Sequence, residues 1–397
     1  MNESVAFPEG FIMSIFKRLV ILLATIFSLT FPFPLSISAE ESSPPSVSAQ
    51  SAILIDGQNG AVLFEKQADL RLPMASTTKI MTALVALENL SLDTVITVDP
   101  RAVGVEGSSV YLVAGEQLTL EQLLYALLLE SANDAATAIA IGVAGSVEKF
   151  ADLMNQTAAD MGLENTRFQN PHGLDHAEHY TTARELAQIS ASALKNPTFS
   201  AIVATRKTTI PHSGNDGVRL LVNHNRLLRE YDGAIGIKTG FTKRSGRCLV
   251  SAAQRNGATL IAVTLNAPND WQDHTALLDF GFSQMETVSL CEAHQICIPI
   301  SVVGGDKKAI FISNPRELTV SLPKGHSEIK KVVEIPRFLY ASIDAGETVG
   351  RMIYKSDLDN DGTLETIAEM PLTAQTAVER TRTKRSLWQW LQSFWER

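Results

Sequence analysis

The stretch Met74–Glu88, MASTTKIMTALVALE, constrains the fold more than any other segment. Its apolar residues recur at helical spacing, which predicts a helix over 77–90 with one buried face. Residues three apart are neighbours on a helix, so the Lys79 amine can reach the Ser76 hydroxyl. If burial and a nearby cation lower the pKa of Lys79, the neutral amine can accept the proton of Ser76. The segment therefore predicts an activated hydroxyl at the start of a buried helix.

The Ser-x-x-Lys pattern alone does not identify this pair, because it occurs six times, beginning at Ser14, Ser76, Ser146, Ser192, Ser321 and Ser327. Apart from Ser14 in the apolar N-terminal stretch, only Ser76 precedes both Ser131-Ala-Asn133 and Lys238-Thr-Gly240. A second Ser-x-Asn, at 213–215, lies in a glycine-rich turn. Ser131 instead ends an apolar helix that is expected to hold it rigidly. The order of the three motifs therefore selects Ser76.

The rest of the chain predicts an α+β protein. Residues 51–66, SAILIDGQNGAVLFEK, carry a turn between two apolar runs and predict a β-hairpin. Thr119 and Gln122 form a capping-box pattern, and Asn133 or Asp134 is expected to cap the next helix. Beyond about 219, the runs GAIGIKTG, CLVSAAQ and TLIAVTLNA predict neighbouring antiparallel strands, followed by a helix near 277. We expect an antiparallel sheet flanked by helices.

We divide the chain into five parts. Residues 1–39 are expected to be a signal peptide, because Lys17 and Arg18 precede an apolar run and small residues. An uncleaved anchor is the alternative, and translation starting at Met13 suits the charge pattern better. Residues 40–50 are a proline-containing linker, and 51–286 form the catalytic domain. Residues 287–374, with runs such as ICIPISVV, AIFIS, LTVSL and VGRMIYK, form a small all-β domain.

The final part, 375–397, predicts a membrane-binding helix. Basic residues precede an apolar and aromatic stripe of Leu387, Trp388, Leu391, Phe394 and Trp395. Such a helix suits the surface of an anionic membrane. The alternative is a helix packed on the protein itself. We therefore expect an exported protein, held peripherally at the outer face of the cytoplasmic membrane.

Composition and short motifs exclude other classes of function. A formal charge of −9 gives no general basic surface, so we expect no nucleic-acid partner. There is no CxxC or HExxH, so no metal and no cofactor is expected. Residues 357–362, DLDNDG, resemble a calcium loop, but position twelve is Ala368, which favours a hairpin turn. For the three cysteines we favour buried free thiols over a bridge between Cys291 and Cys297.

The three motifs in this order resemble the signature of penicillin-binding proteins and serine β-lactamases. The closer resemblance is to the exported D-alanyl-D-alanine carboxypeptidases of the low-molecular-weight penicillin-binding group. It extends over PMASTTKIMTAL, LLLESANDAA, NPHGLDHAEHYTTARELA and GIKTGFT, the β domain and the tail, which is nearly the whole mature chain. The resemblance implies a serine hydrolase that removes the terminal D-Ala from peptidoglycan stem peptides and is acylated by β-lactam antibiotics.

The resemblance also implies a role for each motif residue. Ser76 would attack the penultimate D-Ala carbonyl with Lys79 as base, and Ser131 and Lys238 would relay a proton to the leaving D-Ala. Asn133 would bind Lys79 and the substrate amide. The substrate-binding residues on the third motif would be Lys238, Thr239, Gly240, Phe241 and Thr242. The backbone N–H groups of residues 76 and 241 would form the oxyanion hole.

His172, in NPHGL, and the nearby Tyr180, Thr181 and Thr182 are interpreted as scaffold beside the site, since Lys79 already supplies a base. The chain also departs from the family pattern. Some relatives hold the peptide end with two arginines, where this chain has His224 and the segment Asp270–Trp271. Carboxylate recognition could then depend on Thr239, Lys238, Thr242 or Arg247.

Three other functions remain open at this stage. A serine β-lactamase shares the nucleophile, but the class A segment E-x-x-L-N is absent from the sequence. A non-catalytic wall-binding protein would not need the complete set of motif residues. Transpeptidation differs only in the acceptor that attacks the acyl-enzyme, which the sequence does not specify.

Overall fold

The computed structural model describes residues 43–212, 217–358 and 362–381. The predicted signal peptide, the start of the linker and the apolar stripe of the tail lie outside these residues, as do residues 359–361 of the predicted hairpin turn. Within the described ranges, no helix combines the length and the apolar character needed to cross a bilayer.

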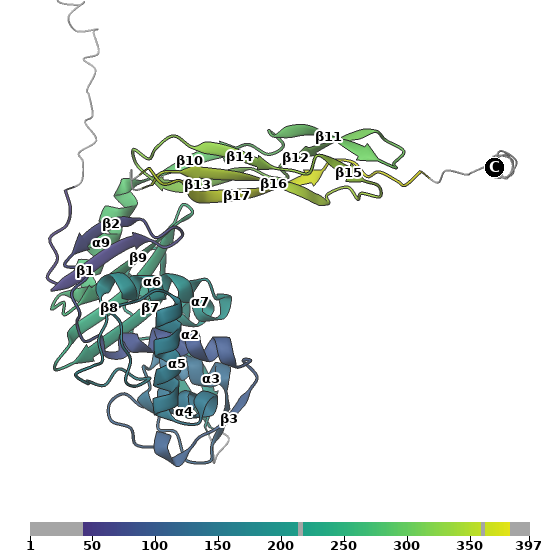
Figure 1. Cartoon of the computed structure of the whole chain (residues 1–397). Coiled ribbons are helices and arrows are strands. Elements are labelled where there is room, and N and C mark those ends of the chain that lie inside the picture. Colours follow the sequence, from purple (N-terminus) through teal and green to yellow (C-terminus); the bar gives the residue numbers. More distant parts are fainter. Residues whose placement is uncertain (1–42, 213–216, 359–361, 382–397) are drawn as a thin grey trace, which may run out of the picture. The chain divides into compact units, whose positions relative to one another are not determined.

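A five-stranded antiparallel sheet in the order β2-β1-β9-β8-β7 organises the N-terminal part of the chain. Its strands are β1 (Ser51–Asp56), β2 (Val62–Lys66), β7 (Ala234–Thr242), β8 (Gly246–Arg255) and β9 (Ala258–Leu265). Alternate residues of β1 enter different cores: Ile53 packs in the cluster beneath the helices, and Leu54 in the cluster beneath the last helix. The sheet is therefore covered on both faces (Figure 1).

In the sequence, most helices lie between the β1–β2 hairpin and strands β7, β8 and β9 of the same sheet. They are η1 (Ala75–Thr78), α2 (Lys79–Asn89), η2 (Pro100–Ala102), α3 (Leu120–Leu129), α4 (Asn133–Ala144), α5 (Val147–Asp160), α6 (Ala183–Leu194), α7 (Pro197–Ala204) and α8 (Leu227–Glu230). Two small hairpins accompany them, β3 (Val95–Thr97) with β4 (Gln117–Thr119), and β5 (Lys207–Pro211) with β6 (Val218–Val222). The capping box of Thr119 and Gln122 is present at α3. The last helix, α9 (Asp270–Gln284), covers the other face of the sheet.

The C-terminal part is entirely β. Its strands are β10 (Met285–Cys291), β11 (Cys297–Val303), β12 (Ala309–Ser313), β13 (Leu318–Pro323), β14 (Lys330–Glu334), β15 (Phe338–Tyr340), β16 (Thr348–Ser356) and β17 (Glu365–Ala374). They form a β10–β13 pair and a six-stranded sheet, β14-β16-β17-β12-β11-β15. The predicted α+β fold with a C-terminal all-β domain is confirmed.

The cysteines differ in part from the expectation. All three are free thiols, and Cys248 and Cys291 are buried as expected. Cys297 is exposed, because it occupies an outward position of β11. The prediction of burial was therefore wrong for this residue.

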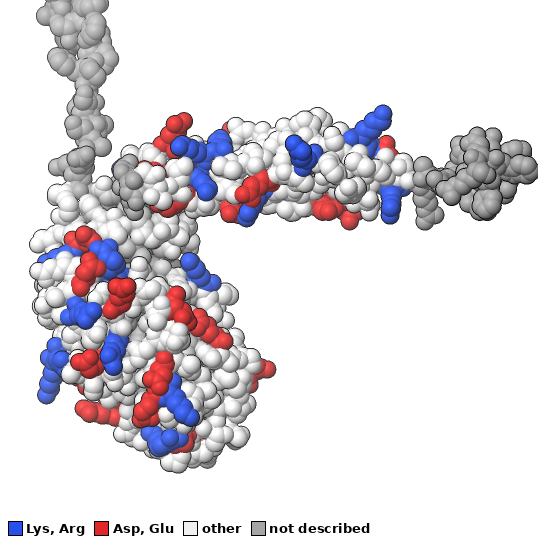
Figure 2. All heavy atoms as spheres, in the orientation of Figure 1, with Lys and Arg blue, Asp and Glu red and all other residues white. Residues whose placement is uncertain are grey.

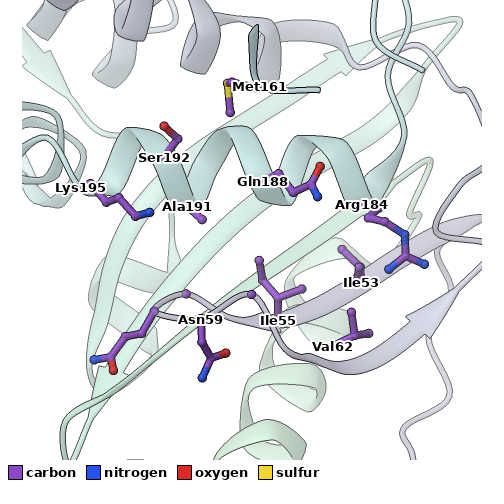
Figure 3. A pocket seen from close by; sticks show the side chains of 13 residues that line it. Ile53, Ile55, Asn59, Val62, Met161, Arg184, Gln188, Ala191, Ser192 and Lys195 are labelled. Atoms are coloured by element: carbon purple, nitrogen blue, oxygen red, sulfur yellow. The ribbon is translucent and has the colours of Figure 1, made fainter. Parts of the chain in front are cut away.

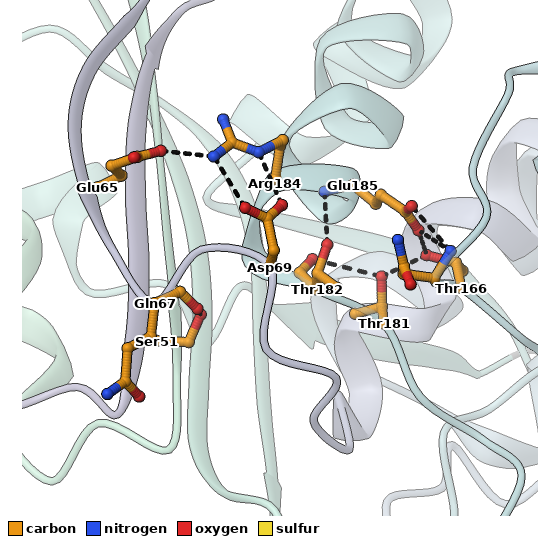
Figure 4. A network of polar contacts seen from close by, with 10 residues as sticks. Ser51, Glu65, Gln67, Asp69, Thr166, Thr181, Thr182, Arg184 and Glu185 are labelled. Atoms are coloured by element: carbon orange, nitrogen blue, oxygen red, sulfur yellow. Dashed lines mark hydrogen bonds and ion pairs between the residues drawn. The ribbon is translucent and has the colours of Figure 1, made fainter.

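Polar contacts attach α6 to the segments around it (Figure 4). The Arg184 guanidinium donates to Glu65 on β2 at 2.5 Å and to Asp69 at 2.8 Å. Next to it, the buried Glu185 carboxylate accepts from the Asn165 backbone N–H at 2.8 Å and the Thr166 hydroxyl at 2.5 Å. These contacts hold the start of α6 against two loops.

Replacing Glu185 tests how much this network contributes to stability. In Glu185→Ala the buried donors lose their acceptor, so the free energy of unfolding should fall by about 2 kcal/mol. Urea unfolding followed by circular dichroism measures the change. Glu164→Ala, at an exposed neighbouring position, is the matched control and should change stability by less than about 0.5 kcal/mol. Equal effects of the two substitutions would contradict a stabilising role for the network.

Candidate active site

The predicted hydroxyl–amine pair is present, although the local structure differs from the prediction. Ser76 lies in the 3-10 turn η1, and Lys79 is the first residue of α2, so the α-helix begins later than predicted. A 3-10 turn also aligns residues three apart. Lys79 Nζ therefore reaches Ser76 Oγ at 2.9 Å.

Lys79 is completely buried and has three hydrogen-bond partners. Besides Ser76, its Nζ donates to Asn133 Oδ1 at 2.7 Å and to the His172 backbone oxygen at 2.6 Å. Burial, and then the charge of Lys238, lower the pKa of Lys79 well below its ordinary value. The protein thus favours the neutral amine, which is the form that can accept a proton.

Asn133 supports Lys79 and does not cap a helix. It is the first residue of α4, whose N-cap is Ala132, and no side chain caps this helix, so the capping prediction was wrong. The Asn133 side chain instead donates to the Glu106 backbone oxygen at 2.5 Å while its oxygen accepts from Lys79. Gly107 lies alongside with φ +95°, where a Cβ would come within 2.7 Å of Asn133 Nδ2.

Ser131 lies in the connection between α3 and α4. It is not part of the helix, because α3 ends at Leu129. Its φ of +60° is a left-handed conformation that costs free energy for a serine, and its side chain is buried. The connection thus directs Ser131 to the wall of the same cavity as Ser76.

The third motif lies on β7 at the edge of the five-stranded sheet. Lys238 is buried, and its Nζ donates to the Thr239 backbone oxygen at 2.9 Å. Burial lowers the pKa of Lys238 to about 7, although the charge of Glu130 acts in the opposite direction. Lys238 is therefore only partly charged at neutral pH.

Two glycines allow the chain to approach η1 closely. A Cβ on Gly240 would lie 3.0 Å from the Ser76 backbone nitrogen, so β7 and η1 touch where the oxyanion hole is expected. On another side, a Cβ on Gly173 would come within 1.9 Å of the Ala75 carbonyl oxygen. Gly173 also has φ +90°, so a larger residue is excluded by both space and conformation.

These segments enclose a cavity of about 350 Å³. The cavity is lined by Ser76, Ser108, Ser131, His224, Thr239, Gly240, Phe241, Arg247, Asp270 and Trp271. Lys79 contacts Ser76, and Asn133 in turn contacts Lys79. The Thr242 hydroxyl is instead bonded to Asp175 and Ser245 at 2.9 and 3.0 Å. Five of the nine predicted site residues thus line one cavity, and Lys79 touches it through Ser76. Lys238 and Thr242 lie outside its lining.

Two pairs of polar side chains at the cavity wall were not singled out as pairs from the sequence. Arg247 Nε donates to the buried Asp270 carboxylate at 2.9 Å, and the guanidinium lies 5.9 Å from the Trp271 ring. His224 Nε2 lies 3.2 Å from Glu130, which directly precedes Ser131. For the pair of Arg247 and Asp270, there was one indication in the sequence: the segment Asp270–Trp271 stands where some relatives have an arginine.

Histidines beside the site are held neutral. Burial lowers the pKa of His172 to about 3 and that of His179 to about 4. His172 contributes its backbone oxygen to Lys79, and its ring accepts the Leu174 backbone N–H. His179 Nε2 contacts the Thr78 hydroxyl at 2.8 Å, in the same turn as Ser76. These contacts agree with the interpretation of this loop as scaffold.

A second cavity, of about 490 Å³, contains one of the other Ser-x-x-Lys pairs (Figure 3). Ser192 and Lys195 lie on and after α6, above Ile53 and Ile55 of β1. Lys195 is exposed to water, and Figure 3 shows its amine pointing away from the Ser192 hydroxyl. Burial of the amine therefore distinguishes Ser76–Lys79 from this pair.

Two family models match the chain. The D-alanyl-D-alanine carboxypeptidase model matches residues 38–269, and the model of the penicillin-binding protein 5 C-terminal domain matches 286–380. The D-alanyl-D-alanine carboxypeptidase DacF of Bacillus subtilis is 32% identical over 356 residues, which cover 86% of this chain and 90% of DacF.

Solved structures show the same relationship. Penicillin-binding protein 5 from Haemophilus influenzae has 28% identity and a TM-score of 0.60, covering 85% of this chain and 99% of its own. The Streptomyces K15 DD-transpeptidase has 36% identity and a TM-score of 0.58, covering 61% of this chain and 99% of its own. The family, fold and enzyme class predicted from the sequence are confirmed: the chain belongs to the D-alanyl-D-alanine carboxypeptidase family of serine hydrolases.

Proposed function

We propose that this protein removes the terminal D-Ala from peptidoglycan stem peptides through an acyl-enzyme on Ser76, and that β-lactam antibiotics acylate the same serine. The observation that carries the proposal is the 2.9 Å contact between Ser76 Oγ and the buried amine of Lys79. A neutral Lys79 takes the serine proton as Oγ attacks the penultimate D-Ala carbonyl. The developing oxyanion is bound by the backbone N–H groups of residues 76 and 241.

Ser131 and Lys238 deliver a proton to the nitrogen of the leaving D-Ala. A pKa of about 7 suits Lys238 to exchange protons near neutral pH. Asn133 holds Lys79 and the substrate amide, and Gly240 lets the peptide lie close to β7. Water then hydrolyses the ester on Ser76 and regenerates the free hydroxyl.

Arg247 anchors the terminal carboxylate of the substrate together with Thr239. Of the residues considered from sequence, Lys238 is partly neutral and the Thr242 hydroxyl is engaged by Asp175 and Ser245. Arg247 is a permanent cation on the cavity wall. Its Nε is held by Asp270, and its terminal nitrogens have no hydrogen-bond partner in the described part of the chain. The two terminal nitrogens of Arg247 are therefore available to donate to the carboxylate of a substrate.

The organisation of the chain follows from this chemistry. Peptidoglycan lies outside the cytoplasmic membrane, so residues 1–39 serve as the export signal and 40–50 as a linker. Residues 51–286 form the catalytic domain and 287–374 the β domain. Residues 375–397 attach the enzyme peripherally to the outer face of the membrane.

Transpeptidation is the second candidate function. It is favoured by the likeness to the Streptomyces K15 protein, whose name describes a DD-transpeptidase. Both reactions share the acyl-enzyme on Ser76. They differ in whether water or an amine takes the acyl group.

Ser76→Ala tests the nucleophile. Release of D-alanine from a pentapeptide ending in D-Ala-D-Ala should fall at least about a thousandfold, because the acyl-enzyme cannot form. Mass spectrometry after penicillin treatment should find an adduct on the wild type and none on the variant. Ser192→Ala, in the exposed Ser-x-x-Lys pair, should behave as wild type.

Four outcomes would redirect the proposal. An adduct that persists in Ser76→Ala would place the nucleophile elsewhere. Rapid turnover of penicillin would indicate a β-lactamase, and the absence of any adduct on wild type would indicate a binding protein. Adding a D-amino acid and finding an exchanged peptide would identify transpeptidation.

The pH dependence of acylation tests Lys79. Because the base must be neutral, the rate of acylation by a fluorescent penicillin should rise as the pH increases through the pKa of Lys79, which lies well below its ordinary value of 10.5. Lys79→Arg keeps a protonated side chain at every working pH and should lose at least about a hundredfold in rate. Lys195→Arg should leave the profile unchanged. A flat profile from acid to alkaline pH, retained in Lys79→Arg, would exclude Lys79 as base.

Arg247→Ala tests the carboxylate anchor. It should lower kcat/KM for the D-Ala-D-Ala peptide by roughly 10- to 100-fold, the usual effect of losing a charge-assisted hydrogen bond. It should change kcat/KM little for the same peptide with a C-terminal amide, which carries no charge to be bound. Arg226→Ala is the matched control, since Arg226 also stacks on Trp271, at 5.6 Å, but does not line the cavity. Equal losses with both substrates would show that Arg247 acts only on the fold.

A further inference from the structure

Half of the six-stranded sheet in the β domain has an outward face without charged side chains. In β11, β12 and β15, alternate residues enter the core and the others are exposed. The exposed residues are Cys297, Pro299, Ser301, Val303, Ala309, Phe311, Phe338 and Tyr340. We call all of these except Cys297 and Ser301 the apolar face. Tyr340 is 69% exposed and Phe311 52% exposed. No Lys, Arg, Asp or Glu occupies an outward position of these three strands, all of which lie in the described ranges.

The apolar face extends across the three strands around one small polar residue, Ser301, which pairs with Ala309 and Phe338. Val303 pairs with Tyr340, and Pro299 pairs with Phe311, so these side chains are cross-strand neighbours. The Phe338 and Tyr340 rings also touch edge to face at 5.3 Å between centroids. A contiguous exposed surface of this kind marks an interaction site more often than scattered single residues do.

The other half of the same sheet has the charged exterior usual for a solvated strand. On β14, β16 and β17, Arg351 bonds Glu334 at 2.7 Å and Glu369 at 3.1 Å. The lack of charge is therefore confined to β11, β12 and β15. These strands lie at the end of the domain where the described chain finishes (Figure 1).

The chain leaves the β domain beside the apolar face. Thr381, the last described residue, donates its backbone N–H to the Gly304 oxygen at 3.0 Å, and Gly304 directly follows Val303. Only residues 382–386 separate Thr381 from the apolar stripe that begins at Leu387. Even fully extended, such a connection spans at most about 20 Å. If the stripe binds a membrane, this end of the β domain must lie close to the same surface.

We propose that the apolar face is a second membrane contact, which rests on the lipid interface beside the C-terminal tail. This inference depends on the membrane attachment proposed above. Binding at the lipid interface strengthens with the apolar area that is buried there, so a second contact would add to that of the tail. Exposed cations border the face at Lys307, Lys308 and Arg337, and Arg382, Lys384 and Arg385 follow in the sequence. These charges favour an anionic bilayer as the partner.

The test compares binding to vesicles of phosphatidylglycerol and phosphatidylethanolamine. The variants are the triple substitution Phe311→Ser, Phe338→Ser and Tyr340→Ser, a chain ending at Thr381, and the combination of both changes. The triple variant should bind about tenfold more weakly than the wild type. The shortened chain should keep weak binding, and the combination should lose it. Val332→Ser with Val333→Ser, exposed apolar residues on β14 at the opposite edge of the sheet, is the matched control and should bind like the wild type.

Two further measurements make the outcome specific. A fluorophore attached at Tyr340→Cys in a Cys297→Ser background should shift to shorter wavelength on adding vesicles, and the same label at Lys330→Cys should not. Release of D-alanine from a soluble peptide should be equal in all variants. If neither the wild type nor any variant released D-alanine, the proposed catalytic function would be wrong. The vesicle experiments would still decide whether the apolar face binds a membrane.

Unchanged vesicle binding in the triple variant would overturn the proposal. So would stronger binding, since it would mean that the tail itself had occupied the face. A wild-type dimer in sedimentation experiments that the triple substitution dissociates, with vesicle binding intact, would assign the face to a second copy of the chain.

Discussion

The burial of two lysine side chains is the constraint on which the rest of the site depends. An ammonium group removed from water is costly unless it is paired or loses its proton. Neither Lys79 nor Lys238 has a carboxylate bonded to its amine in the described chain, and burial lowers the pKa of each. The fold therefore supplies neutral oxygens as partners, from Asn133, His172 and Thr239. Those oxygens belong to segments far apart in the sequence, which is why the catalytic groups and the architecture form together.

The sequence predicted the elements whose residues interact locally. The capping box of Thr119 and Gln122, the hairpin of β1 and β2 and the antiparallel order of β7, β8 and β9 follow from periodicity and turn residues. The convergence of the three motifs was expected from the family resemblance and the chemical need for it. Figure 2 shows acidic and basic residues interspersed on the face in view.

Predictions failed where tertiary contacts override local preference. Asn133 has the residue type of a helix cap, but two longer-range partners, Lys79 and the Glu106 oxygen, use its side chain. Ser131 follows an apolar helix yet adopts a left-handed backbone outside it. The contact of Arg247 with Asp270 joins residues 23 apart on different elements, and no local pattern encodes it. The exposure of Cys297, by contrast, follows from alternation in β11, which turns Ile298 and Ile300 toward the core and Cys297 outward.

The tight packing at Gly173 limits which substitutions this enzyme can accept. The carbonyl of Ala75 already occupies the space that any side chain at 173 would need. The loop that carries His172 therefore packs directly against η1, the turn that contains Ser76. The same loop supplies the backbone oxygen that accepts a hydrogen bond from Lys79. A lineage under antibiotic selection could not loosen the nucleophile by substitution at this glycine without losing the lysine's support as well.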